Sequence, residues 1–210
     1  MIKINPTILL VRPQLPENIG MVARAMDNFG LSKLSIVNPR DGWPSNKAKD
    51  ASKHGIKIIT NAKIFNSLDE ALKNYSLVIA TSNRKRFLTK KTYNNFDILK
   101  KNICEHKKVA ILFGPENSGL SNQDLRLANF IFTIPTANSN KSINLSHSVT
   151  ILSHELFNLN QTTHSSENSL KSDRIIKLEL SNYLDFLIKE LDSKDFFNPI
   201  EKKESMIDNI

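Results

Sequence analysis

Small polar residues cluster at three places where an apolar run gives way to a helix-like pattern. These segments are Ser142–Ser146, Pro16–Gly20 and Phe113–Leu120. In an α/β sheet such junctions bring backbone groups and helix N-termini together. Small polar side chains can then hold a cofactor or substrate there without burying an unpaired charge. The three segments therefore predict a ligand site at the ends of strands.

The glycines of the middle segment do not match the common nucleotide motifs. Gly114 and Gly119 have the spacing of a phosphate-binding loop, but Leu120 and Ser121 stand where that motif requires Lys and Ser or Thr. No G-x-G-x-x-G follows an expected strand, so the main signal for a dinucleotide site is missing. The segment is either a tight turn without a ligand or a turn that lets a ligand approach bare backbone.

The elements that position these segments alternate between strands and helices. Apolar runs rich in β-forming residues are separated by helix-compatible sequence, which predicts an α/β fold with a parallel sheet and flanking crossover helices. The expected strands are 8–11, 34–37, 56–59, 77–81, 109–113 and 130–134.

Helical spacing of apolar residues predicts the packed faces of two helices. It also predicts a third helix near the C-terminus. The run 158–169 is rich in Asn, Gln, Thr and Ser and predicts a linker, and apolar residues between 175 and 191 predict a long amphipathic helix that docks on the core or on a second subunit. The two apolar stripes are Val22, Met26 and Phe29, and Leu145, Val149, Leu152 and Leu156.

Composition narrows the class of protein. The net charge is +8, and the residues from Ser169 onward carry 7 Lys and Arg against 9 Asp and Glu, which leaves 22 against 12 in the preceding part. The basic part favours a polyanionic partner such as nucleic acid. With one cysteine, Cys104, the sequence predicts neither an internal disulfide nor a thiol-rich zinc site. We expect a cytosolic protein with no membrane segment, since no apolar stretch is long enough to cross a bilayer.

A basic stretch follows the fourth expected strand. It is either a contact surface for an RNA backbone or a solvated loop. Histidines show no spacing typical of a metal site, so we expect no metal. The basic residues, with Phe87 and Tyr93 interleaved, are Arg84, Lys85, Arg86, Lys90 and Lys91.

Taken in order, the three polar segments resemble the motifs of the SpoU/TrmH family of SPOUT RNA 2′-O-ribose methyltransferases, and within it the TrmJ-like tRNA enzymes. The resemblance runs from about Ile8 to Leu156. It implies an α/β domain over 1–160 with a C-terminal trefoil knot, although knots are rare exceptions to topology rules. It further implies a homodimer that binds S-adenosylmethionine at the knot. Residues 161–210 would form a linker and a helical extension.

The resemblance also implies roles for individual residues. Arg24 would orient the target ribose and activate its hydroxyl electrostatically, because a guanidinium rarely gives up a proton; alternatively it pairs with Asp27. Glu116 would accept the hydroxyl proton, orient Asn18 and Asn144, or simply stand at a helix start. Asn144 is also a candidate helix cap. The implied catalytic residues are Asn18, Arg24, Glu116, Ser142 and Asn144, and the implied cofactor contacts are Thr81, Ser82, Asn83, Gly114, Ile134, Ser142, Ile143 and Asn144.

The expected function is methylation of the ribose of nucleotide 32, a cytidine or uridine, in the anticodon loop of tRNA. Two departures from the TrmJ-like pattern leave the wobble nucleotide or rRNA open as targets. Pro115 stands where those enzymes commonly carry Arg, and the tail to Ile210 is shorter than their usual extension. Rivals of another class are a non-catalytic knotted RNA-binding scaffold and a small-molecule binder.

Overall fold

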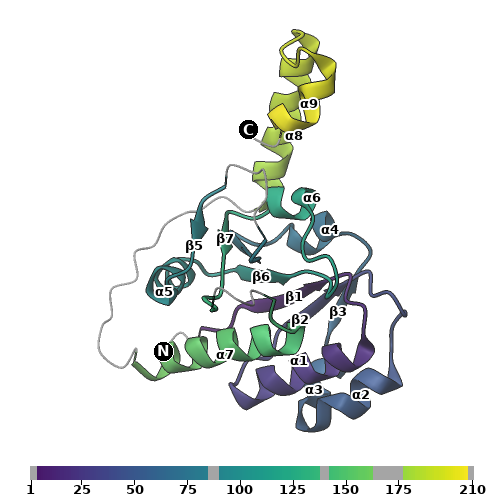
Figure 1. Cartoon of the computed structure of the whole chain (residues 1–210), viewed down its shortest axis with the longest axis vertical. Coiled ribbons are helices and arrows are strands. Elements are labelled where there is room, and N and C mark those ends of the chain that lie inside the picture. The colour runs from purple at the N-terminus through teal and green to yellow at the C-terminus, as the bar shows by residue number, and fades with distance from the viewer. Residues whose placement is uncertain (1–3, 85–89, 138–141, 163–176, 208–210) are drawn as a thin grey trace.

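The computed structural model describes residues 4–84, 90–137, 142–162 and 177–207. In this part of the chain seven strands form one sheet, and every pairing is parallel. The predicted parallel α/β sheet with flanking helices is confirmed (Figure 1). The sheet order is β3-β2-β1-β6-β4-β7-β5, and the strands are β1 Thr7–Val11, β2 Leu34–Val37, β3 Lys63–Phe65, β4 Leu77–Thr81, β5 Thr92–Tyr93, β6 Val109–Phe113 and β7 Phe130–Phe132.

Helices cover both faces of this sheet, as the apolar composition of its central strands requires. Successive residues of β1 alternate between two cores: Ile8 and Leu10 pack in one, and Leu9 and Val11 in the other. The first core includes residues of α1, α5 and α7, and the second includes residues of α4 and α6. The helices are α1 Pro16–Asn28, α2 Asn46–Ser52, α3 Ile56–Thr60, α4 Leu68–Leu72, α5 Phe96–Cys104, α6 Asn122–Arg126, α7 Leu145–Thr162, α8 Lys177–Ser193 and α9 Lys203–Ile207, with short 3₁₀ turns at Lys53–Gly55 and Ile200–Lys202.

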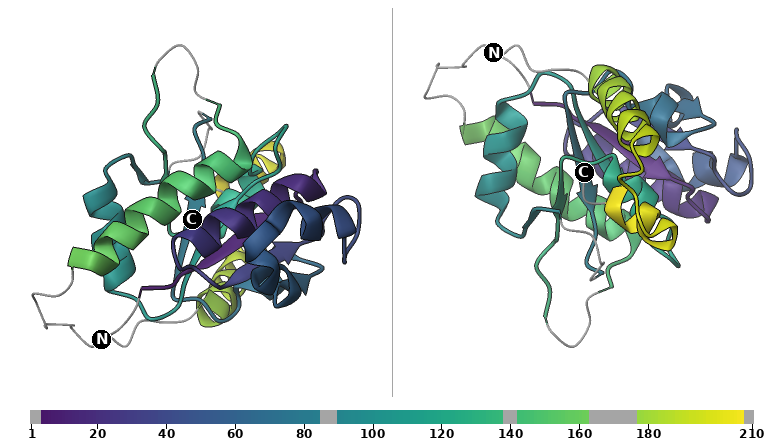
Figure 2. Two further views of the ribbon diagram at one scale, coloured as in Figure 1. Left: turned by 90° about the horizontal axis from the view of Figure 1, so that it is seen from below. Right: turned by 90° about the horizontal axis from the view of Figure 1, so that it is seen from above.

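The predicted helix stripes are confirmed as core faces except at Phe29, which follows the last residue of α1 and is half-buried. Val22 and Met26 of α1 are fully buried, and Leu145, Val149, Leu152 and Leu156 of α7 are at most 6% exposed. The two helices lie side by side on one face of the sheet (Figure 2). This layer presents the N-terminal ends of both helices to the carboxyl edge of the strands.

The expected strand at 56–59 is wrong, because these residues form helix α3. Ile58 and Ile59 are adjacent and both buried, whereas Ile56 is 38% exposed, so burial follows a helical face and not the alternation of a strand. Packing against α1 overrides the β-propensity of isoleucine here. The third strand is instead β3, which begins at Lys63, and β5 was not predicted.

The predicted linker is wrong over residues 158–162, which continue α7, and its remaining residues lie outside the described part of the chain. The predicted C-terminal helix is confirmed as α8. Its first residue, Lys177, is buried, and its backbone N–H donates to the carbonyl of Tyr75 at 2.8 Å. The rest of α8 projects away from the sheet with α9 beside it, opposite the α1–α7 layer (Figures 1 and 2). Among the described residues no helix is long and apolar enough to cross a membrane.

Candidate functional site

A pocket of about 270 Å³ opens where β4, β6 and β7 end. Parallel strands bring their carboxyl ends to one edge, and this is where ligands bind in open α/β sheets. The walls combine apolar side chains with hydroxyls, an amide and one charge of each sign. The lining residues are Thr81, Ser82, Asn83, Arg84, Phe113, Gly114, Pro115, Glu116, Gly119, Phe132, Ile134, Ser142, Ile143, Leu145 and Ser148.

The segment after β4 is fixed by hydrogen bonds to the neighbouring strands. The hydroxyl of Thr81 donates to the carbonyl of Leu112 at 2.7 Å, and the hydroxyl of Thr133 donates to the carbonyl of Ser82 at 2.7 Å. The backbone N–H of Ser82 donates to Phe132 at 3.1 Å. The wall formed by Thr81 and Ser82 is therefore rigid before any ligand arrives, which lowers the entropy cost of binding.

The glycine-rich segment after β6 closes on itself. A side chain at Gly114 would place its Cβ 2.3 Å from the backbone nitrogen of Leu120, and Gly119 has φ +65°. The backbone N–H of Gly119 donates to Pro115 at 2.8 Å. Gly114 is thus needed for the turn itself, and the turn also lines the pocket. Arg84 secures the turn through a 2.6 Å hydrogen bond to the carbonyl of Asn117.

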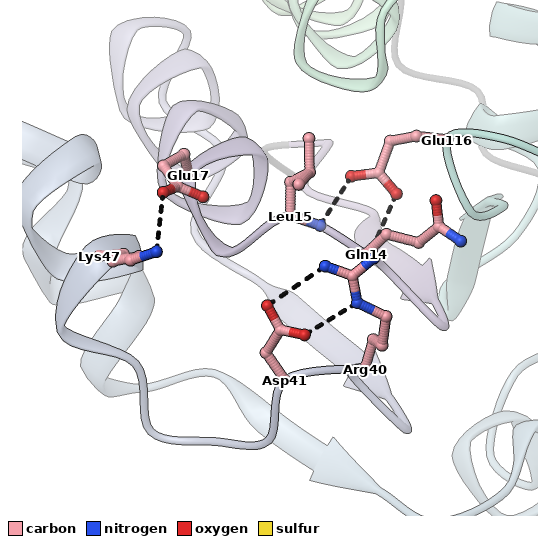
Figure 3. A network of polar contacts seen from close by, with 7 residues as sticks. All are labelled: Gln14, Leu15, Glu17, Arg40, Asp41, Lys47 and Glu116. Carbon is pink, nitrogen blue, oxygen red and sulfur yellow. Dashed lines mark hydrogen bonds and ion pairs between the residues drawn. The ribbon is translucent and has the colours of Figure 1, made fainter.

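Glu116 holds the start of α1 against this turn. Its carboxylate accepts from the backbone N–H of Gln14 at 2.8 Å and of Leu15 at 3.3 Å (Figure 3), and from the side-chain amide of Asn18 at 2.8 Å. Leu15 precedes the helix and has no side-chain cap of its own. Glu116 therefore holds the backbone just before α1, at the positive end of the helix, and it also binds the Asn18 side chain. No contact with Asn144 is seen among these bonds.

Asn144 caps α7, as expected. Its side-chain oxygen accepts from the backbone N–H of Ser146 at 2.9 Å and from the Ser146 hydroxyl at 2.8 Å. The cap fixes the direction in which Ser142 and Ile143 enter the pocket wall. Asn144 itself is exposed and is not among the lining residues.

Arg24 lies outside the pocket of its own chain. It is exposed on α1, two turns beyond Asn18, and its expected pairing with Asp27 is not found. Of the basic stretch, Arg84 lines the pocket and Lys91 is exposed. Lys85 and Arg86 lie outside the described residues.

Lys90 stabilises the end of helix α6. Its ammonium donates to the carbonyls of Leu125, Arg126 and Ala128 at 3.0, 2.7 and 2.6 Å, and so satisfies the end of α6. Burial, and next the charge of Lys177, lower the pKa of Lys90 to about 8. Burial also lowers the pKa of Lys177. All three ammonium hydrogens of Lys90 are used inside the fold, which leaves none of them to donate to an RNA phosphate.

The sequence analysis missed Ser148 in the lining of the pocket and Asp124 in the first turn of α6. Ser148 lines the wall one helical turn after Asn144, a spacing that the helix period supplies. Asp124 is 4% exposed, completes a capping box with Ser121 and receives an ion pair from Arg12. The sequence signal was Ser121 followed three residues later by an acidic residue.

The pocket fits S-adenosylmethionine in the chemistry of its lining. The planar adenine requires apolar walls, which Phe113, Phe132 and Ile134 provide. The amino-acid end of the cofactor carries both an ammonium and a carboxylate, and the lining holds Glu116 and Arg84. Among the described residues there is no group of three side chains that would hold a metal ion.

A parallel α/β domain with such a pocket at its carboxyl edge belongs to the class of small-ligand-binding α/β folds. The chain matches the model of the SpoU rRNA Methylase family over residues 5–154, and it belongs to that family. It is 32% identical over 154 residues to the tRNA (cytidine-2'-O-)-methyltransferase TrmJ of Methanocaldococcus jannaschii, covering 72% of this chain and 66% of that one. The chain thus spans just under two thirds of that relative's length.

Solved structures agree with this assignment. The crystal structure of TrmJ from Z. mobilis ZM4 superposes with a TM-score of 0.83 at 35% identity, covering 97% of this chain and 87% of that one. The SpoU methyltransferase AviRb from Streptomyces viridochromogenes, in complex with the cofactor AdoMet, has a TM-score of 0.60 at 21% identity, covering 77% and 63% of the two chains. At that identity the second likeness shows the fold alone.

Proposed function

We propose that the chain is an S-adenosylmethionine-dependent methyltransferase that modifies a ribose 2′-hydroxyl of tRNA, at nucleotide 32 of the anticodon loop. The observation that carries the proposal is the meeting of the three polar segments at one edge of the sheet. Glu116 and Ser142 line one pocket, and Glu116 also binds Asn18. Family membership and the tRNA substrates named for its relatives support the reaction class.

In the proposed reaction the ribose 2′ oxygen forms a bond to the methyl carbon of the cofactor. The carbon–sulfur bond breaks, its electron pair stays on sulfur, and the 2′ proton passes to water. The chain contributes mainly positioning, which can be worth roughly 7–11 kcal/mol for a well-oriented pair of reactants. Glu116 already accepts from three N–H groups, so we assign it to holding Asn18 and the α1 start and not to accepting the 2′ proton.

We propose that the protein is a homodimer built on the α1–α7 face. Large apolar side chains are exposed on this face: Met21 of α1, and Ile151 and Phe157 of α7, each 36–41% exposed. Burying them against a second copy is favourable by roughly 25 cal/mol per Å² of apolar surface. Arg24 lies on α1 one turn after Met21, so it would stand at the subunit boundary, where it can act on a substrate bound across both chains.

The fold proposal includes the trefoil knot that the resemblance implies. It is supported by the sheet order, because β7 lies between β4 and β5, two strands that precede it in the chain. A late strand inserted between earlier ones requires the chain to return into the sheet. Because tRNA is the proposed substrate, the expected cytosolic location belongs to the same proposal.

The test is transfer of labelled methyl from S-adenosylmethionine to bulk tRNA, followed by nuclease digestion and mass spectrometry of the labelled nucleotide. We expect a 2′-O-methylated pyrimidine at position 32. Label at the wobble ribose or in rRNA would support the proposed reaction but show that nucleotide 32 is not the target. No transfer to either RNA, despite cofactor binding, would refute the proposed activity.

Arg24→Ala separates chemistry from cofactor binding in the same assay. We expect methyl transfer to fall at least 100-fold, the size of loss seen when one preorganised charge is removed from a transition state. Binding of S-adenosylhomocysteine, measured by calorimetry, should stay within about twofold of the unmodified chain, since Arg24 does not line the pocket. Unchanged turnover would remove Arg24 from the mechanism.

A further inference from the structure

A second recess lies on the other side of the glycine-rich turn and has no role in the site described above. It holds about 420 Å³ and shares Pro115 with the cofactor pocket. The residues lining it include two arginines and no carboxylate. They are Arg12, Gln14, Asn38, Pro39, Arg40, Pro115, Asn117 and Ser118.

Two of the residues that line this recess have an unusual backbone conformation. Arg12 and Asn38 directly follow the neighbouring strands β1 and β2, and both have positive φ, +48° and +44°. Left-handed conformations are unfavourable for arginine, less so for asparagine, and they cluster at ligand sites. Hydrogen bonds hold them, since the N–H of Arg12 donates to Val37 at 2.8 Å and the N–H of Asn38 donates to Phe65 at 2.9 Å. The residue that directly follows each of these two adjacent strands therefore has a left-handed backbone conformation.

Each guanidinium group pairs with a carboxylate and still has further N–H donors. Arg12 pairs through Nη2 with Asp124, which is buried, and its own side chain is 41% exposed. Arg40 pairs with Asp41 through Nε at 2.8 Å and Nη2 at 3.4 Å (Figure 3), and its side chain is 54% exposed. A guanidinium has five N–H donors, so each arginine is oriented by its carboxylate and keeps donors for an anion.

The position of the recess indicates which anion it takes. The turn of residues 114–119 separates it from the pocket, and its Pro115 faces both. An RNA strand that places a ribose at the cofactor pocket can reach the recess by crossing this turn, because Pro115 lines both cavities. Gln14, Asn38 and Asn117 add side-chain amides, which can bond base edges as well as phosphate oxygens.

We propose that this recess, through Arg12 and Arg40 in its lining, binds a nucleotide of the RNA strand next to the methylated one and holds it by its phosphodiester. The proposal rests on the proposed function for the identity of the strand. It gives the chain a second contact with the substrate, one that fixes which ribose reaches the pocket.

The test is binding of an unmodified tRNA transcript by fluorescence anisotropy, without cofactor, over a series of salt concentrations. For Arg40→Ala we expect an approximately tenfold rise in Kd, as for the loss of one charge-assisted hydrogen bond. The slope of log Kd against log salt should fall by about 0.7 to 0.9, the value for one phosphate contact. The matched control is Lys108→Ala, which removes an exposed cation just before β6, at the opposite edge of the sheet.

A second variant guards against loss of the fold. Arg12→Ala would leave Asp124 buried without its partner, so Arg12→Lys is used, which keeps the charge but not the planar fork of donors. It should weaken RNA binding while the circular dichroism melt stays unchanged. Arg40→Ala and Lys108→Ala with equal Kd and equal salt slope would overturn the proposal. Absence of methyl transfer by the unmodified chain would refute the proposed function instead, and the binding comparison would still decide the recess.

Discussion

Helices α7 and α8 have nearly the same length, 18 and 17 residues, and both carry apolar residues at helical spacing. In α7 the stripe packs on the sheet, and Val149, Leu152 and Leu156 are fully buried. In α8 the apolar residues Leu184, Leu187 and Ile188 are only half-buried, and Tyr183 and Phe186 are 59% and 60% exposed. An apolar period therefore marks a face that can pack but does not reveal what covers it. The two helices also start differently, α7 on a polar cap beside the pocket and α8 on a buried lysine.

The largest expected effect contrasts the two packed faces. Leu152→Ala should lower the free energy of unfolding by about 2–5 kcal/mol, because it leaves a cavity between α7 and the sheet. Phe186→Ala should change it by less than about 0.5 kcal/mol, as for an exposed position. Urea denaturation followed by circular dichroism measures both. Equal losses would mean that α8 is covered in solution, and the contrast between the helices would be wrong.

The next effect concerns the start of α1, where Glu116 from the turn after β6 supplies the hydrogen-bond acceptor. Glu116→Gln replaces one acceptor oxygen with an NH₂ group that faces N–H donors from Gln14 or Asn18. We expect a loss of about 1–3 kcal/mol in stability. Methyl transfer should fall at least tenfold, because Asn18 loses its fixed orientation. Glu17→Gln is the matched control, since its 3.7 Å ion pair with Lys47 is exposed (Figure 3) and should contribute little.

A smaller effect is expected at the start of α7. Asn144→Ala removes the acceptor for the Ser146 N–H and should cost about 0.5–2 kcal/mol in stability. Asn144→Asp keeps that acceptor and should restore most of the stability. If Asn144→Asp regains stability but not methyl transfer, the residue acts on the ligand as well as on the helix. Full recovery of both would leave it a cap only.

Much of this arrangement could be predicted from the sequence, because its signals are local. Unbroken apolar runs identify the buried strands, and helical spacing identifies the apolar stripes of α1 and α7. Residues 56–60 could not be placed this way, since isoleucine favours strands and the packing of α3 on α1 is a tertiary effect. In the sequence Lys90 belongs to a basic stretch, and only the folded chain places its ammonium next to the end of α6. The ion pair of Arg12 with Asp124 joins positions far apart in the chain.

The smallest effect is a pH dependence where α8 begins. The pKa of Lys90 is about 8 in the folded protein and 10.5 in the unfolded chain. Between these values the unfolded chain binds more protons, so the free energy of unfolding should rise with pH over that window. Lys90→Met should lack this rise, and the difference should stay under about 1 kcal/mol because the Lys90 side chain is only part-buried. A parallel pH curve for the two proteins would contradict it.

The most direct measurement compares two tRNA transcripts that differ in one atom, with ribose or 2′-deoxyribose at nucleotide 32. Labelled methyl from S-adenosylmethionine should be transferred to the ribose form only, although both RNAs bind with similar affinity. That result would tie the pocket at the carboxyl edge of the sheet to one hydroxyl group. Equal labelling of the two transcripts would contradict methylation at that ribose, and labelling of neither would contradict the proposed activity.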